Sequence, residues 1–175
     1  EFYEPDVWVQ GERRRYGVEL RWLPGPCSVK AEYIRLSQER RQQSVEETDL
    51  SPLLGIGWYV SATWTVTGER SAAARRNPSR PITRGGPGAI EVAGRVEALE
   101  FSSAARGDLP STSARADVVL GNRLRVVTAG VNWYPLRFFK VQFNLMYESL
   151  ADPEQGPAPA WSAFWSRIVR LQFAF

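Results

Sequence analysis

Apolar and polar residues alternate singly along most of this chain. A period of two is typical of a β-strand whose two faces meet different surroundings, because successive strand side chains point to opposite sides. Seven segments have this pattern, so the sequence predicts seven strands. The segments cover residues 15–22, 29–33, 58–67, 90–98, 127–134, 139–148 and 165–175.

The predicted strands are long. They run to about ten residues, the length with which a tilted strand crosses a bilayer, whereas soluble strands usually have about five or six. One face of each strand is apolar and the other polar, as in an outer-membrane barrel with lipid outside and water in the lumen. A soluble sheet that buries one face alternates in the same way, so the placement of the aromatic residues has to decide between the two.

Aromatic residues gather at the ends of the predicted strands, and Val and small residues fill the middles. Two aromatic girdles around an aliphatic band are what the two lipid–water interfaces select. The sequence therefore favours an antiparallel up-and-down transmembrane β-barrel. A soluble β-sandwich that binds a ligand is the less favoured interpretation, and it predicts folding in water without detergent. The expected interface aromatics are Trp22, Trp58, Trp64, Trp133, Phe139, Tyr147, Trp165, Phe173 and Phe175.

The connections between the predicted strands are of two kinds. Residues 24–26 (PGP) and 135–137 (PLR) are expected to be tight turns, since Pro and Gly favour turn geometry. An up-and-down order puts both turns at one end of the sheet and the long loops at the other, which is usual in outer-membrane barrels. The stretch 69–87 breaks this pattern, because it is long and yet lies at the end with the tight turns. The expected long, polar loops are residues 40–54, 102–122 and 151–160.

The composition excludes several classes of function. The chain has 175 residues and no apolar run long enough for a transmembrane helix. It has no His, so His-dependent catalytic triads and His metal sites are ruled out, and the single Cys27 cannot form an internal disulfide. We expect no enzyme activity, no metal and no cofactor. The net charge of only +3 and the short Arg clusters give no reason to expect nucleic-acid binding.

Seven strands are too few for a closed barrel formed by one chain, which has an even number and at least about eight. An open sheet edge in lipid would leave backbone hydrogen-bonding groups unpaired. The missing strands must therefore lie upstream or be supplied by another chain. We expect residues 1–175 to be the C-terminal part of a single barrel domain, with its N-terminal strands and a signal peptide upstream.

Charged residues on the polar parity would line the lumen, where wall charge sets ion selectivity. A row of cations could hand a phosphate along by charge-assisted hydrogen bonds. Alternatively, Arg–Glu pairs between neighbouring strands could stiffen the wall, and the balance of six cations against five anions favours this interpretation. The expected lumen cations are Arg15, Arg21, Lys30, Arg95, Lys140 and Arg170, and the expected lumen anions are Glu19, Glu32, Glu91, Glu97 and Glu148.

Two arginines fall on the parity that would face lipid, Arg125 and Arg167. Both lie near the loop ends of their strands, where a long side chain can extend to the lipid headgroups. A β-bulge that turns the side chain to the other face is the alternative explanation.

Five pieces of the chain resemble the phosphate-selective porin O and P family of Gram-negative outer membranes. They occur in the family's order and spacing across residues 16–175. Ile90 and the pair Thr65-Val66 depart from the family's usual residues. The pieces are residues 29–35 (VKAEYIR), 57–70 (GWYVSATWTVTGER), 88–95 (GAIEVAGR), 128–134 (TAGVNWY) and 170–175 (RLQFAF).

The resemblance implies a sixteen-stranded barrel, usually a homotrimer, that passes small anions such as phosphate or polyphosphate across the outer membrane by passive diffusion. The terminal Phe175 resembles the signal that barrel-assembly machinery reads in the last strand. Outer-membrane lipid is the other expected partner. The competing hypothesis is a structural barrel that anchors an assembly in the outer membrane without selective transport.

Overall fold

The computed structural model describes residues 11–42, 48–70, 77–103, 122–151 and 161–173. They form one antiparallel sheet in which the strands follow each other in sequence order. The predicted all-β, up-and-down architecture with seven strands is confirmed. The strands are β1 (Arg13–Trp22), β2 (Cys27–Arg40), β3 (Leu50–Thr65), β4 (Ala89–Ser103), β5 (Asn122–Leu136), β6 (Phe139–Ala151) and β7 (Trp161–Phe173).

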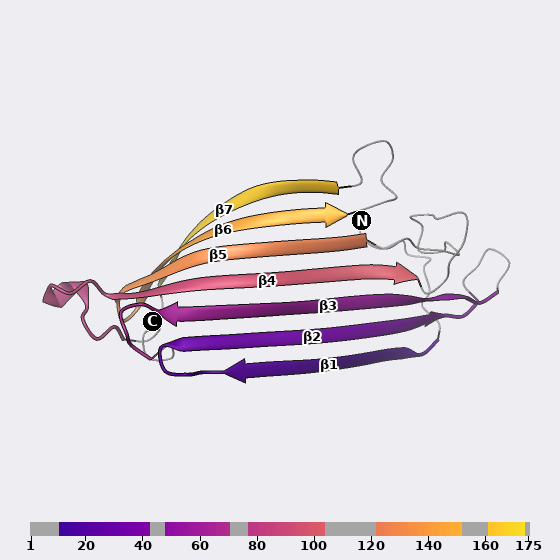
Figure 1. Ribbon diagram of the computed structural model, residues 1–175, viewed down its shortest axis with the longest axis horizontal. Coiled ribbons are helices and arrows are strands. Elements are labelled where there is room, and N and C mark those ends of the chain that lie inside the picture. Colours follow the sequence, from indigo (N-terminus) through magenta and orange to yellow (C-terminus); the bar gives the residue numbers. More distant parts are fainter. Residues whose placement is uncertain (1–10, 43–47, 71–76, 104–121, 152–160, 174–175) are drawn as a thin grey trace.

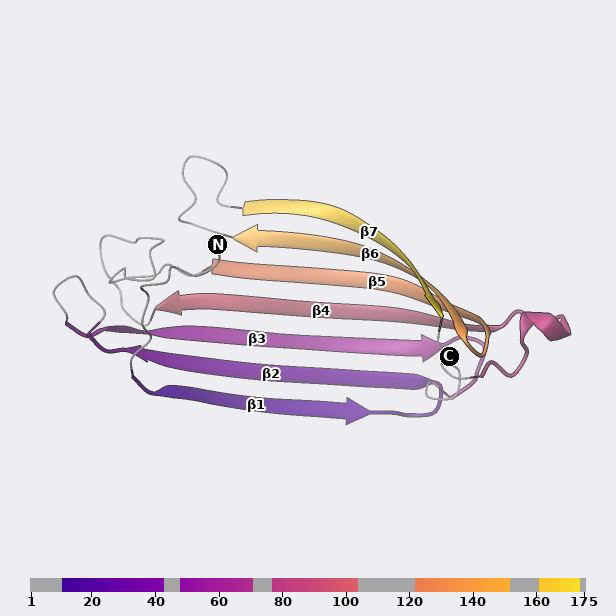
Figure 2. The same cartoon turned by 180° about the vertical axis from the view of Figure 1, so that it is seen from behind.

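The sheet is a single layer of long strands lying side by side, and β5, β6 and β7 bend near one end (Figure 1 and Figure 2). Among the described residues no second layer covers either face, so the two-sheet core of a soluble sandwich is absent from this part of the chain. No helix in the described segments is long and apolar enough to cross a membrane. Within the described ranges the few buried hydrophobic residues are Leu50, Ala89, Ala98, Val126 and Tyr134.

Connections alternate between the two ends of the sheet. We call the end with the β1–β2, β3–β4 and β5–β6 connections the turn end, and the end with the β2–β3, β4–β5 and β6–β7 connections the loop end. The strands reach further toward the loop end than predicted. The expected loop limits were therefore wrong. Polar residues on one face of a strand are of the same types as the residues of a loop, so the ends of these strands were assigned to loops. Residues assigned to loops that lie in strands are Arg40, Leu50 to Leu54, Ser102, Ser103, Asn122 and Ala151.

The first tight turn is confirmed, and the second lies slightly later than predicted. The amide of Cys27 donates to the carbonyl of Pro24 at 3.0 Å and closes the β1–β2 turn. β5 continues through Pro135 and Leu136, so the second turn consists of Arg137 and Phe138. The register shifts between Trp133 and Leu136, and such an irregularity is where a strand accepts a proline.

The β3–β4 connection is long, as predicted, but β3 ends earlier than predicted. Val66 and Thr67, expected to extend β3, form a turn instead. The chain then includes the short 3₁₀ helix η1 (Ile82–Arg84) and returns to the turn end of β5. There the indole of Trp133 donates to the carbonyl of Pro87 at 2.8 Å. Gly88 (φ +76°) lies so close to Tyr134 that an added Cβ would be 2.6 Å from its carbonyl oxygen. Only glycine fits this approach.

The carboxylate of Glu69 forms hydrogen bonds within the β3–β4 connection. Glu69 accepts hydrogen bonds from the hydroxyl of Ser79 at 2.6 Å and from the hydroxyl of Thr67. Burial raises the pKa of the Glu69 carboxyl, but the hydrogen bonds from Ser79 and Thr67 outweigh burial and hold the pKa below its ordinary value. Glu69 therefore joins the start of the connection to Ser79 at the turn end.

The two faces of the sheet differ in composition. Residues that are paired across neighbouring strands lie on the same face of the sheet throughout. The register shifts only between Gln38 and Arg40 and between Trp133 and Leu136. The apolar face carries exposed aliphatic residues, and we call the opposite side the charged face. Side chains of the charged face are on the whole the less exposed, as expected where they converge on the concave side of a curved sheet. The exposed aliphatic residues of the apolar face include Val18, Leu20, Val60, Val92, Val96, Val127, Val131, Val169 and Leu171.

Candidate functional site

All eleven charged residues predicted to line a lumen lie on the charged face. Pairing across the strands connects them without a change of face. The register also sorts most of them by sign, which the sequence parity alone did not indicate. Three of the six cations occupy one line of paired positions, and four of the five carboxylates occupy the next line toward the loop end. The residues outside these two lines are Arg15, Glu91, Lys140 and Arg170.

The cationic line crosses β1 to β4. Arg21 is directly opposite Lys30, Lys30 is opposite Ser61, and Ser61 is opposite Arg95. We call Arg21, Lys30 and Arg95 the cationic row. Directly opposite residues have Cβ atoms about 5 Å apart, and like charges at that distance destabilise the pair. Within the part of the chain that the structure describes, neither Arg21 nor Lys30 has a carboxylate partner.

The acidic line lies two residues further toward the loop end. Glu19 is opposite Glu32, Glu32 is opposite Tyr59, and Tyr59 is opposite Glu97. Across β5, Val126 separates Glu97 from Glu148. We call Glu19, Glu32, Glu97 and Glu148 the acidic row.

Arg95 of the cationic row is held in place by two side chains of the neighbouring acidic line. Its guanidinium donates twice to Oε2 of Glu97, at 2.8 and 2.5 Å, and its Cζ lies 4.0 Å from the centre of the Tyr59 ring. This ion pair runs along β4, not between neighbouring strands. Among the described residues of the charged face, the expected Arg–Glu pairs between strands are therefore not formed by the cationic and acidic rows. An arginine that donates two hydrogen bonds to one carboxylate and stacks on a ring keeps a fixed orientation.

Nearer the turn end the charged face is more enclosed. Glu91 is only 1% exposed, and its Oε1 accepts from the side-chain amide of Asn132 at 2.8 Å and from the hydroxyl of Tyr134 at 3.5 Å. Glu91 was predicted to line the lumen, but its burial makes it a structural group of the β4–β5 pair. Lys140 lies over the ring of Tyr134 at 5.6 Å, and Arg170 is paired in register with Gln142.

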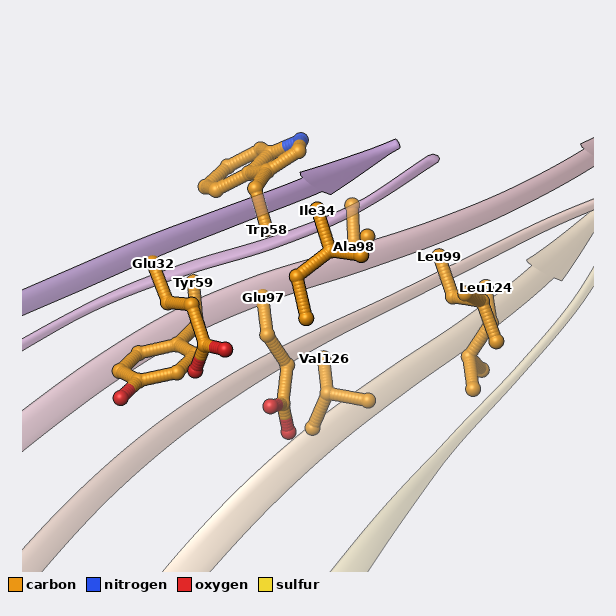
Figure 3. A pocket seen from close by; sticks show the side chains of 10 residues that line it. Glu32, Ile34, Trp58, Tyr59, Glu97, Ala98, Leu99, Leu124 and Val126 are labelled. Atoms are coloured by element: carbon orange, nitrogen blue, oxygen red, sulfur yellow. The ribbon is translucent and has the colours of Figure 1, made fainter. Parts of the chain in front are cut away.

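Next to the acidic row on its loop-end side, the charged face is apolar on β2 to β5, whereas on β1 it carries Arg15, which is opposite Leu36. A hollow of about 390 Å³ lies there, and Figure 3 shows Tyr59 and Glu97 on the opposite side from Trp58. Leu99 lies over Gly57, where an added Cβ would be 3.6 Å from its Cδ1. We call this region the apolar hollow, and its main lining side chains are Ile34, Leu99, Leu124 and Val126 with the carboxylates of Glu32 and Glu97 at its edge.

The prediction of a uniformly polar inner face missed the apolar hollow. A signal was present, because apolar residues change parity after Ala98: Leu99 and Phe101 occupy positions of the polar parity. Gly57 and Gly55, directly opposite them, leave the space that these side chains cover.

The predicted interface aromatics lie on the apolar face near the two ends of the sheet. Trp22, Trp64, Trp133 and Phe173 are exposed toward the turn end, and Trp165 is exposed further toward the loop end. Ring contacts join Phe139 to Phe173 at 4.8 Å and Tyr147 to Trp165 at 5.0 Å. Trp58 is partly exposed on the same face, and Phe175 lies outside the described residues.

No group of three or more potential metal ligands occurs in the described ranges. Comparison with protein families finds a match over residues 4–175 to the family described as phosphate-selective porin O and P. Searches of curated proteins and of solved structures find no match.

Proposed function

This chain belongs to the phosphate-selective porin O and P family and is part of an outer-membrane porin channel, and from this premise we propose that the cationic row of its charged face is the anion path. The charged face lines water, and the apolar face contacts lipid in the bacterial outer membrane. Transport is passive diffusion of small anions, phosphate among them, without cofactor or turnover.

The main support for this proposal is that two cations of the row have no carboxylate partner. Arg21 and Lys30 face each other across β1 and β2 with no carboxylate partner in the described chain. Their mutual repulsion costs stability, and an anion between them relieves it. Because barrel strands are tilted by about 35–45°, a row that runs across strands is inclined to the pore axis and changes height along the lumen. Successive cations thus offer an anion a stepped path.

The dimensions of the sheet support a membrane wall. Its strands contain 10 to 16 residues, enough for the roughly 9–11 residues that a tilted crossing needs. Among the described strands β1 and β7 have an unpaired edge. We propose that further strands of the sixteen-stranded family barrel pair with these edges, and that the porin is a homotrimer inserted by barrel-assembly machinery.

Ion selectivity of the full-length porin in a planar bilayer tests the proposal. Replacing Arg21, Lys30 and Arg95 together with Gln should move the reversal potential in a KCl gradient toward the value of a non-selective pore. Added phosphate should reduce chloride current through the wild-type channel more than through the variant. Unchanged selectivity in an open, folded variant would show that the anion path lies elsewhere.

The matched control removes the same type of charge from the other face. Arg125→Gln should leave the reversal potential unchanged, because Arg125 lies on the apolar face. Loss of selectivity in this control would indicate a general effect of net charge and would contradict a path along the cationic row.

A further inference from the structure

The apolar face carries arginines that the channel function does not use. Arg35, Arg125 and Arg167 are exposed on this face, and the register is continuous through all three, so the alternative of a β-bulge at Arg125 or Arg167 is wrong. Their neighbours across the strands are small or uncharged. Arg125 lies between Ala98 and Ser149.

These three arginines have no hydrogen bond or ion pair within the part of the chain that the structure describes. Other charged residues near the loop end of this face neutralise each other. Arg123 pairs with Glu100 at 2.7 Å, and Arg14 pairs with Glu12 at 2.7 Å. Among the described residues these acidic side chains are therefore already paired, and Arg35, Arg125 and Arg167 remain as excess positive charge. We call these three residues the outer arginines.

Arg35 and Arg167 share one height once the strand tilt is considered, and Arg125 lies roughly two residues nearer the loop end than that height on β5. From Arg35 to Arg167 the register steps toward the turn end, because Arg35 is aligned with Arg123 while Arg167 is aligned with Ala129. That step is six residues (129 − 123) over five strand pairs. A tilt of about 40°, with strands about 4.8 Å apart and 3.3 Å per residue, predicts a step of roughly six residues over the same five pairs.

The aromatic residues of the turn end follow the same slope. Trp22 is aligned through the sheet with Arg167, whereas Phe173 lies six residues (173 − 167) further toward the turn end on β7. Along β5, Arg125 and Trp133 are eight residues apart (133 − 125). At about 3.3 Å per residue and a tilt of about 40°, that separation is roughly 20 Å along the membrane normal. The apolar band of such barrels is about 25 Å tall, so extended arginine side chains reach its opposite border.

We propose that the outer arginines bind the phosphate groups of a phosphorylated lipid in the leaflet at the loop end. Guanidinium groups bind phosphate through paired, charge-assisted hydrogen bonds, and the desolvated border of the membrane strengthens them. The three residues are distributed from β2 to β7 around a curved wall, which suits several small lipid headgroups better than one protein partner. This inference rests on the proposed orientation of the apolar face toward lipid.

Binding of a defined lipid to the full-length porin tests this inference. Native mass spectrometry in detergent would count bound diphosphoryl lipid A on the wild type and on an R35Q/R125Q/R167Q variant. We expect the variant to bind at least about tenfold more weakly, as the loss of several charge-assisted contacts implies. Monophosphoryl lipid A should bind the wild type more weakly than the diphosphoryl form. Equal binding by wild type and variant would overturn the inference.

Three comparisons identify the source of any difference. R95Q, which removes an arginine from the charged face, should leave lipid A binding unchanged. Competition of lipid A by millimolar inorganic phosphate alone would indicate a free-phosphate site and contradict a lipid site. A variant that loses its trimers but retains lipid A would assign the outer arginines to a subunit contact instead.

The outcome is separable from that of the proposed function. The R35Q/R125Q/R167Q variant should keep the reversal potential of the wild type, because none of its changes lies on the charged face. If this variant does not fold, an R35K/R125K/R167K variant retains the charge but loses the planar fork, and it should bind diphosphoryl lipid A more weakly than the wild type. Wild-type affinity in the lysine variant would contradict recognition by guanidinium groups.

Discussion

Arg95 and Arg125 lie on neighbouring strands but on opposite faces of the sheet. Arg95 is bonded to Glu97 and stacked on Tyr59, whereas Arg125 is exposed beside Ala98 and Ser149 and has no bonded partner among the described residues. The same residue type is thus anchored at one of these two positions and unpaired at the other. The difference indicates that the neighbours which strand parity and register give an arginine decide whether it is held in place.

The largest effect is expected from a new charge in the middle of the apolar face. Ala129→Arg places a cation between Gly94 and Leu145, far from either border of the apolar band. It should reduce the free energy of unfolding in lipid vesicles by about 2–4 kcal/mol, the cost of a midplane arginine. Urea titration of the full-length protein in vesicles measures this change.

The matched control puts the same residue on the other face. Met146→Arg lies on the charged face, opposite Thr128 and Ser166 and near the acidic row. Its unfolding free energy should change by less than about 1 kcal/mol, because the side chain remains in water. Similar losses in both variants would contradict the assignment of the two faces.

Sequence reasoning could establish the two faces because alternation depends on only one strand at a time. The parity of Val96 and Arg95, for example, follows from their position in a continuous alternating segment. Strand number and the up-and-down order followed in the same way. Strand limits near the loop end did not, since residues such as Leu53 and Ser102 interrupt the alternation without leaving the sheet.

The sorting of charge into rows could not be predicted from one strand. Whether Arg21 meets Lys30 or Glu32 depends on the register between β1 and β2, which the Pro24 turn sets. A shift of two residues would replace like-charge neighbours by ion pairs without changing either face. Arg–Glu pairs between strands, which were expected on this face, are for this reason not formed by the cationic and acidic rows in the described part of the chain. The apolar hollow was missed because Leu99 lies over Gly57 of another strand.

A second, smaller effect concerns the anchoring of Arg95. Glu97→Gln removes the carboxylate that holds Arg95 and one member of the acidic row. Anion preference of the full-length channel should rise by about threefold, since the freed guanidinium and the lost negative charge act in the same direction. Reversal potentials in a KCl gradient measure the permeability ratio.

The corresponding change on the apolar face, Glu100→Gln, frees Arg123 and should leave the ratio unaltered. A fall in anion preference for Glu97→Gln would show that Glu97 orients Arg95 for anion binding.

The smallest expected effect compares glycines on the two faces. An added Cβ at Gly94, on the apolar face, meets no atom within 4 Å, whereas at Gly55, on the charged face, it lies 3.4 Å from the ring of Phe101. Gly94→Ala should raise the free energy of unfolding by about 0.5 kcal/mol, because alanine loses less backbone freedom on folding. Gly55→Ala should gain less, since the ring of Phe101 has to shift. Urea titrations of both variants in vesicles give the difference. Equal gains would indicate that the ring of Phe101 is free to move away from Gly55.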